Sequence, residues 1–355
     1  MLEWFAAGGA ALYAGAALRA FLRRDLSASA YPSPGRAEAE IDALARQHPE
    51  RCAIEEIGRS SEGRPIRALR LRGTGADPAP GSSRPRLLVT AHIHAVEFVG
   101  SFVARAVAHR LATGYGRDRE TTALLDRADV FVVALLNPDG AERVWRSGGF
   151  CTLGGARFTA RGVDPNRNFP FVPIAERGAW NTGRDRRGSA YYRGPHPLSE
   201  PECLAVARLA ERERFCGALN FHSFGGVVYL PAAEGSAAAR HALGAFQGPF
   251  QSRQRFLRYR PVPERSAAIT GQLDAFLLGA FGTPSATIEV SRPGLALAKP
   301  GRLPNVFWIA NPEDPARWAE NDADAAIFAL GELLARTGGR PCAPTQPELA
   351  NRLSG

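Results

Sequence analysis

The chain has 355 residues, 45% of them hydrophobic, and its 44 lysines and arginines against 35 aspartates and glutamates give a formal net charge of +9. A chain of this length and hydrophobic content can bury a large core, and single α/β domains reach this size. The positive charge is not gathered into a dense basic run interleaved with aromatic residues, which argues against binding to nucleic acid. We find no internal repeat and no long linker, which predicts a single domain over residues 37–337.

An apolar extension, residues 1–36, precedes this domain. The run from Trp4 to Leu18 is apolar, with Glu3 before it and arginines after it. A secretory signal carries its positive charge first, so this order is the reverse of a signal peptide. A membrane span needs about 20 apolar residues, and this run is shorter and interrupted by glycines. We expect a helix packed on the domain, with a membrane anchor through residues 4–22 as the less favoured alternative.

Apolar, strand-like runs alternate with helical stretches along the rest of the chain. The expected strands are Arg86 to Ala91, Asp129 to Leu135, Gly217 to Phe221 and Pro284 to Val290, and the expected helices are Phe98 to Ala112 and Leu198 to Arg214. This alternation predicts an α/β fold, with a mixed, mostly parallel twisted sheet and helices on both faces. The loop-rich region 141–193 is expected to contact the substrate, because loops on a rigid scaffold carry such residues. Residues 338–355 are rich in proline and polar residues and are expected to form a flexible tail.

A histidine and a glutamate lie three residues apart where the first of these strands gives way to a helix. His94 and Glu97 can converge there, and an imidazole nitrogen and a carboxylate oxygen are two of the three protein ligands of a catalytic zinc ion. The pair alone is also typical of a helix-start glutamate beside a polar-facing histidine. His222 is the best third candidate, because it ends an apolar strand and precedes a glycine turn. In an open α/β sheet, sites gather outside the carboxyl ends of such strands.

The other histidines and the cysteines add no second metal motif. The histidines that lie in polar loops or on helix surfaces are His48, His109, His196 and His241. His92 is expected to face the solvent, with support of a metal ligand as the alternative. The 5 cysteines show no metal-like spacing, and their odd number argues against a complete disulfide framework, which favours a reducing, cytoplasmic setting.

Glu289 is the candidate general base. It stands at the end of the strand-like segment that begins at Pro284, where a charge that was simply buried would be costly. Hydrolysis of an amide requires a carboxylate that takes a proton from water and passes it to the leaving amine. The structural alternative is an edge-strand glutamate paired with an arginine, which is common in a chain this rich in arginine.

Several motifs fall in one order along the chain. They are Ile93–Glu97, Asn137–Gly140, Val144–Arg146, Gly162–Phe169, Ser199–Glu202, Phe221–Ser223 and Thr287–Glu289, after an N-terminal hairpin over Ile57–Ile66. In this order and spacing, the chain resembles the zinc metallocarboxypeptidases of the carboxypeptidase A and B type. The resemblance spans roughly Ala37 to Leu334, which is most of the chain.

The resemblance implies one bound zinc ion, with the protein ligands His94, Glu97 and His222. It implies that Glu289 is the general base and then the general acid. Arg146 matches the family arginine that stabilises the oxyanion, a role that suits a fixed guanidinium. Asn166 and Arg167 match the pair that grips the terminal carboxylate of the substrate, which a planar guanidinium meets with two parallel hydrogen bonds. The expected substrate is therefore a peptide or peptide-like molecule with a free C-terminal carboxylate.

Substrate selectivity depends on positions where the chain departs from the family. The family tyrosine that closes over bound substrate falls at Ser266, counted back from Gly271, and a serine reaches less far and does not stack. This departure bears on the substrate class before it bears on hydrolysis. Leu273 falls near the floor of the side-chain pocket, which favours an apolar or uncharged terminal residue. Asp274 beside it would reverse that preference after a shift of one residue.

The leading hypothesis is a zinc-dependent carboxypeptidase that removes one C-terminal residue by promoted attack of water. The alternatives with the same chemistry are an amidase or carboxypeptidase acting on peptidoglycan peptides and a hydrolase of small-molecule amides. A catalytically silent, zinc-bearing binding protein is disfavoured, because the candidate catalytic and substrate-binding residues occur together. An amidohydrolase barrel built on His92 and His94 ranks last, since many such sites need a bridging lysine and the only lysine is Lys299.

Overall fold

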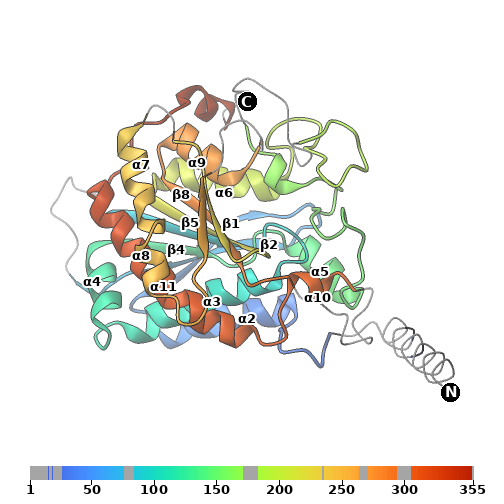
Figure 1. Cartoon of the computed structure of the whole chain (residues 1–355), viewed down its shortest axis with the longest axis horizontal. Coiled ribbons are helices and arrows are strands. Elements are labelled where there is room, and N and C mark those ends of the chain that lie inside the picture. Colours follow the sequence, from blue (N-terminus) through green and yellow to red (C-terminus); the bar gives the residue numbers. More distant parts are fainter. Residues whose placement is uncertain are drawn as a thin grey trace, which may run out of the picture.

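The computed structural model describes residues 26–75, 84–170, 183–233, 236–263, 271–293 and 305–353, with Gly15 and Leu18 as isolated positions. Most of the expected N-terminal helix, and Ser266, lie outside these residues. The described chain forms one 8-stranded sheet with helices on both faces (Figure 1). The α/β architecture and the mixed sheet expected from the sequence are confirmed.

The sheet has the strand order β1-β2-β4-β3-β5-β8-β6-β7. Its strands are β1 (Cys52–Arg59), β2 (Pro65–Leu71), β3 (Arg86–Ala91), β4 (Asp129–Val133), β5 (Gly217–Ser223), β6 (Val227–Leu230), β7 (Arg260–Pro263) and β8 (Ser285–Val290). The central strands β4, β3, β5 and β8 run parallel to one another. The β1–β2, β2–β4 and β6–β8 pairs are antiparallel. All four expected strands are present, and β3 has the expected bounds.

Helices cover the two faces of the sheet. They are α2 (Pro34–Gln47), α3 (Phe98–Gly114), α4 (Arg119–Arg127), α5 (Pro138–Arg146), α6 (Pro201–Glu213), α7 (Ala237–Leu243), α8 (Pro249–Ser252), α9 (Leu273–Phe281), α10 (Phe307–Ala310) and α11 (Pro315–Thr337), with 3₁₀ turns at η1 (Pro165–Arg167), η2 (Gly244–Phe246) and η5 (Pro347–Leu353). Helices α6 and α9 lie on one side of the sheet, and α2, α3 and α11 lie on the other (Figure 1). Over the described ranges, no helix is long and apolar enough to cross a bilayer.

Alternation along the central strands divides the core in two. In β3, Leu87 and Val89 pack in the cluster that α3 and α11 cover, whereas Leu88 packs in the cluster under α6 and α9. Successive side chains of a strand point to opposite faces, so a strand between two helix layers is apolar at nearly every position. The two cores hold the carboxyl ends of these strands in fixed positions, and polar side chains begin there.

The described part of the C-terminal tail is packed on the domain rather than loose. The N–H of Cys342 donates to the carbonyl of Gly282 at 2.8 Å, and the N–H of Gln346 donates to the carbonyl of Gly279 at 2.9 Å. Leu349 is 1% exposed and joins the cluster under α9. The expectation of a flexible tail missed this anchoring, because two leucines in a polar, proline-rich stretch give no periodic signal.

Candidate active site

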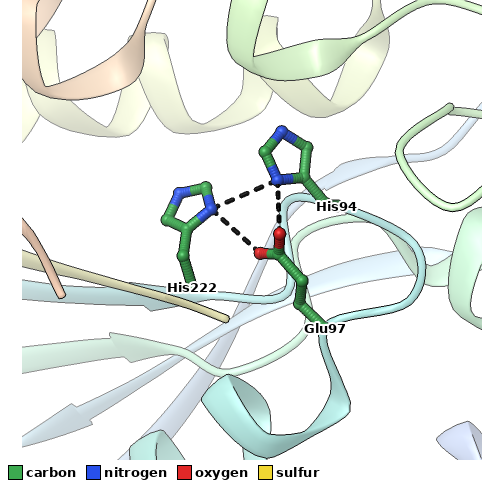
Figure 2. A group of neighbouring side chains, drawn as sticks. All are labelled: His94, Glu97 and His222. Carbon is green, nitrogen blue, oxygen red and sulfur yellow. Dashed lines mark hydrogen bonds and ion pairs between the residues drawn. The ribbon is translucent and has the colours of Figure 1, made fainter. Parts of the chain in front are cut away.

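Three side chains converge at the carboxyl edge of the central strands (Figure 2). His94 follows β3, Glu97 immediately precedes α3, and His222 lies near the end of β5. The Nδ1 atom of His94 is 2.8 Å from Oε1 of Glu97, and the Nδ1 atom of His222 is 2.9 Å from Oε2. The two Nδ1 atoms are 3.2 Å apart. All three side chains, called the triad below, are buried.

The triad fits a zinc ion in spacing and in chemistry. A tetrahedral zinc ion bound at about 2.0–2.1 Å holds its ligand atoms roughly 3.3 Å apart, close to the 3.2 Å between the two imidazole nitrogens. The Oε2 atom of Glu97 is buried and accepts no hydrogen bond of good geometry. A buried acceptor without a donor is costly, and a cation between the three ligand atoms would satisfy it.

Electrostatics keep Glu97 in the form that binds a metal. Burial by itself raises the pKa of Glu97, but the imidazoles of His94 and His222 together hold that pKa well below its usual range. Metal ligation requires the ionised carboxylate. The triad can therefore hold a divalent cation.

Glu97 occupies the N-cap position of α3 without capping the helix. Its carboxylate faces the two histidines, and the side chain of Asn311 accepts the hydrogen bond from the Val99 N–H at 2.9 Å instead. The side-chain amide of Asn311 also donates from Nδ2 to the Val96 carbonyl at 2.7 Å. Because a distant asparagine satisfies a donor that a cap residue usually satisfies, Glu97 is not an ordinary helix-start glutamate.

Two close contacts hold the segment after β3 against its neighbours. The side chain of Asn137 donates from Nδ2 to the Ile93 carbonyl at 3.1 Å, and its Oδ1 accepts the Gly140 N–H at 2.9 Å, which caps α5. On the other side, a Cβ atom at Gly100 would lie 2.9 Å from the carbonyl oxygen of Phe221. Glycine at this position lets α3 approach β5, and this approach brings Glu97 to His222.

Asp164 contacts the triad from behind, and the sequence did not single it out. It is fully buried, and its Oδ1 lies 3.3 Å from Nε2 of His94. Its Oδ2 accepts a hydrogen bond from Nε of Arg157 at 2.9 Å. Burial raises the pKa of Asp164, but Arg157 and Arg167 hold it well below its usual range. A carboxylate behind a ligating histidine fixes the tautomer and orientation of the ring, so Asp164 is a positioning residue for His94.

The structure places Arg146 at the surface of the domain. This residue ends α5, its side chain is 72% exposed, and its Nε donates to Oε1 of Glu142 at 2.6 Å. Arg157 has a side chain only 23% exposed and contacts Asp164. Desolvation lowers the pKa of Arg157, but Asp164 and Glu97 more than offset it and raise the pKa above its usual value. Asp164 joins Arg157 to the triad, which makes Arg157 a second candidate for the oxyanion role beside Arg146.

Glu289 lies beside His222 in the sheet. The two residues are partners in the register of β5 and β8, so their side chains share a face. Strand β8 lies between β5 and β6, which rules out the alternative of an edge-strand glutamate. The N–H of Gly226 donates to the carbonyl of Glu289 at 2.8 Å, and this bond joins the glycine turn after His222 to the same strand. A half-buried carboxylate thus neighbours the triad on a rigid element.

Asn166 and Arg167 lie in the turn η1, and both are buried. Oδ1 of Asn166 accepts the N–H of Leu273 at 3.0 Å, and Nη1 of Arg167 donates to the Asn166 carbonyl at 2.6 Å. The approach requires a glycine at position 271, where φ is +78° and a Cβ atom would lie 2.3 Å from the Arg167 carbonyl oxygen. The expected carboxylate-binding pair and the expected pocket floor are therefore neighbours.

His92 is buried rather than solvent-facing, with 2% exposure. Strand alternation ends there, because His92 adopts a φ of 59° and the chain turns inward. Its Nε2 lies 3.2 Å from the Ala95 carbonyl, and its ring packs on Phe98 at 4.6 Å between centroids. Burial is the main reason that the pKa of His92 falls to about 4, so the ring is neutral. It supports the turn that carries His94.

Asp274 is already engaged by its own neighbours. The hydroxyl groups of Ser285 and Thr287 donate to its two carboxylate oxygens. Burial is the main reason that its pKa is raised, although these hydrogen bonds lower it. Leu273, one residue earlier, is fully buried in the cluster under α6 and α9. A buried carboxyl group that is satisfied by β8 hydroxyls is a poor partner for a basic side chain of a substrate.

The chain belongs to the zinc carboxypeptidase family, whose model matches residues 37–273. Carboxypeptidase A2 of Mus musculus is 31% identical over 205 residues, which cover 54% of this chain and 44% of the relative. Carboxypeptidase A1 of Sus scrofa is 30% identical over 210 residues, with the same coverage. The match spans about half the length of these curated relatives. The family resemblance expected from the motifs is confirmed.

Solved structures share the fold over most of the chain. Bovine thrombin-activatable fibrinolysis inhibitor, solved in complex with tick carboxypeptidase inhibitor, aligns with a TM-score of 0.63 at 20% identity, over 87% of this chain and 97% of that chain. A metallo-carboxypeptidase from Burkholderia cenocepacia aligns with a TM-score of 0.58 at 20% identity, over 86% and 69% of the respective chains. At these identities the likeness supports the common fold alone.

Proposed function

We propose that this protein is a zinc-dependent metallocarboxypeptidase that hydrolyses the C-terminal peptide bond of its substrate. The observation that carries the proposal is that one ligand atom each of His94, Glu97 and His222 lies within 4.8 Å of the other two. Glu289 is beside them, in register with His222. One zinc ion is the metal that this donor set suits best, because two imidazoles and a carboxylate leave a fourth position open.

A zinc ion held by the triad would polarise the scissile carbonyl and lower the pKa of a water molecule. Glu289 accepts the proton of the attacking water and donates it to the leaving amine. Arg157 directs its guanidinium at the negative charge that develops on the carbonyl oxygen. Asp164 orients two of these groups, since one of its oxygens faces His94 and the other accepts from Arg157.

The substrate in this proposal ends in a free carboxylate. Arg167 binds that carboxylate with the two parallel hydrogen bonds that a guanidinium can donate. The N–H of Leu273 donates to Oδ1 of Asn166, so this buried apolar residue lies beside the carboxylate-binding pair, and Asp274 is satisfied by Ser285 and Thr287. An apolar or uncharged terminal residue therefore suits the pocket better than a basic one.

Mass-spectrometric scoring of a mixed library tests the proposal. The library combines L-peptides of varied C-termini with muropeptides that contain D-glutamyl and diaminopimelyl linkages. The wild type is compared with Glu289→Gln, both loaded with zinc. The control is Glu213→Gln, because Glu213 is also a largely buried glutamate, paired with Arg86 at 3.1 Å, but is not part of the site.

We expect single C-terminal L-residues to be lost with the wild type and the control only, while Glu289→Gln keeps its zinc. Unchanged turnover by Glu289→Gln would refute the role of Glu289 as the base. Cleavage confined to the muropeptides would refute the ordinary peptide substrate and identify a peptidoglycan-peptide hydrolase with the same residues. No cleavage of either kind would refute the peptidase function.

A further inference from the structure

The ring of Tyr191 lies over two guanidinium groups of the candidate active site. The Cζ atom of Arg157 is 5.2 Å from the ring centroid, and the Cζ atom of Arg167 is 5.6 Å from it. Both distances fall within the reach of about 6 Å that a cation–π contact requires. Tyr191 itself is half-buried. One aromatic ring is therefore shared by the candidate oxyanion arginine and the candidate carboxylate-binding arginine.

The loop that carries Tyr191 is fastened around this residue. The N–H of Arg184 donates to the Tyr191 carbonyl at 2.8 Å, and the N–H of Tyr191 donates to the Ser189 hydroxyl at 3.3 Å. The carbonyl of the next residue, Tyr192, accepts the N–H of Asp164 at 2.8 Å. The backbone beside Tyr191 is thus joined to the residue whose carboxylate holds Arg157 and faces His94.

The shared ring acts on groups that otherwise repel each other. Arg157 donates from Nε to Asp164, and Arg167 donates from Nη1 to the Asn166 carbonyl. These bonds hold one edge of each guanidinium, and the ring of Tyr191 contacts both groups as well. Because the face of an aromatic ring attracts each cation, Tyr191 offsets part of the repulsion between the like charges and fixes the planes of both groups.

We propose that Tyr191 is a positioning residue that aligns Arg167 with the terminal carboxylate of the substrate and Arg157 with the scissile carbonyl. This inference rests on the proposed carboxypeptidase function and deepens it. A guanidinium meets a carboxylate with two parallel hydrogen bonds in one plane, so the ring that sets the plane of Arg167 sets the affinity for a free C-terminus. The aromatic face carries the effect, and the hydroxyl group is not required.

Kinetics on a peptide with a free C-terminus, taken from those the wild type hydrolyses, separate this role from a general structural one. Tyr191→Leu is expected to raise KM roughly tenfold, the size of one partly desolvated cation–π contact, with a smaller fall in kcat through Arg157. Tyr191→Phe is expected to keep both constants near the wild-type values, because it keeps the ring. The matched control is Tyr115→Leu, which removes a ring 5.2 Å from the Arg51 guanidinium and is expected to leave KM unchanged. An unchanged KM in Tyr191→Leu, or equal damage in Tyr191→Phe, would overturn the proposal.

Chemical labelling tests the same contacts without any substrate. Phenylglyoxal reacts with accessible guanidinium groups, and peptide mass spectrometry gives its rate at Arg157 and Arg167 separately. We expect both arginines to react several times faster in Tyr191→Leu than in the wild type, with Tyr191→Phe like the wild type. Equal rates in all three proteins would show that the ring does not hold the arginines. If the wild type cleaves no peptide, the proposed function fails, while the labelling still decides whether Tyr191 holds the two groups.

Discussion

Replacing Asp164 by asparagine tests whether one carboxylate supports both the metal centre and Arg157. The change keeps the size of the side chain and removes its charge. Asp164 lies 3.3 Å from Nε2 of His94 and 2.9 Å from Nε of Arg157, and its Oδ1 also accepts the Asn166 N–H at 3.1 Å. The substitution should therefore act on stability and on metal binding at the same time.

The contacts of Asp164 set the size of each effect. Removing one partner of a buried ion pair costs about 3–5 kcal/mol of stability. Arg157 keeps 23% side-chain exposure and its contact with Tyr191, so we expect the lower value, about 3 kcal/mol. Loss of a carboxylate behind a ligating histidine lowers metal affinity by about 10–100-fold. Asp164→Asn should therefore be less stable without metal and should bind zinc more weakly.

A second buried aspartate supplies the matched control. Asp129 is fully buried, and its two carboxylate oxygens accept hydrogen bonds from Nε of Arg70 and Nε of Arg84, each at 2.9 Å. It begins β4 and so lies at the amino ends of the parallel strands, whereas the triad lies at their carboxyl ends. Chemical denaturation of the metal-free proteins measures stability, and competition with a chromogenic chelator measures zinc affinity. Asp129→Asn should lose comparable stability and keep wild-type zinc affinity. Wild-type zinc affinity in Asp164→Asn, or equal weakening in Asp129→Asn, would refute the reasoning.

Three further predictions concern Arg157, the buried carboxyl group of Asp322 and the binding of zinc. Arg157→Ala should lower kcat by about 10²–10³-fold, as loss of an oxyanion donor does, whereas Arg146→Ala should change it little; initial rates on one peptide decide between them. Burial raises the pKa of Asp322 from 3.8 to about 7, so the stability it contributes is present below pH 3.8 and is lost as the pH rises to 7. The difference in unfolding free energy between the wild type and Asp322→Asn should fall by roughly 4 kcal/mol over that window, and a constant difference in denaturation at several pH values would contradict this. Zinc at a hundred times its dissociation constant should add about 2.7 kcal/mol of stability, which thermal unfolding before and after chelation should show as a reversible shift of Tm.

The sheet and the triad could be predicted from the sequence because the signals that specify them are local. The run Arg86–Ala91 is mostly apolar and gives a strand buried on both faces. Parallel strands end at one edge of a sheet, so His94 and His222 were expected at the same edge once their strands were assigned. The register of Glu289 with His222 could not be predicted, but its place at the end of a strand could.

The roles of the two arginines could not be assigned in the same way. Arg146 stands next to a tryptophan in a recognisable motif, yet α5 ends there and its side chain faces the solvent. Arg157 lies in an irregular loop with no periodicity, and only the folded chain places it against Asp164. Asn311 is more than two hundred residues from Val99 in sequence, and the contact between them leaves no pattern along the chain. Asp164 stands within the motif Gly162–Phe169, but its burial and its contact with His94 are visible only in the folded chain.

Asp164 also joins the metal-binding part of the site, which the sequence predicts, to the loop with the arginines, which it does not. Its carboxylate faces His94 on the rigid strand edge, and its backbone N–H bonds to Tyr192 in the irregular loop. A movement of this loop would therefore disturb the metal ligand as well as the arginines. Substrate preference should therefore change with little loss of metal affinity at positions that do not hold the carboxylate of Asp164. The ring of Tyr191 lies over Arg157 and Arg167, and the N–H of Leu273 donates to Oδ1 of Asn166, so both residues act on the substrate-binding side of the site. Substitutions at these two residues should alter KM and the preferred terminal residue while zinc affinity stays constant.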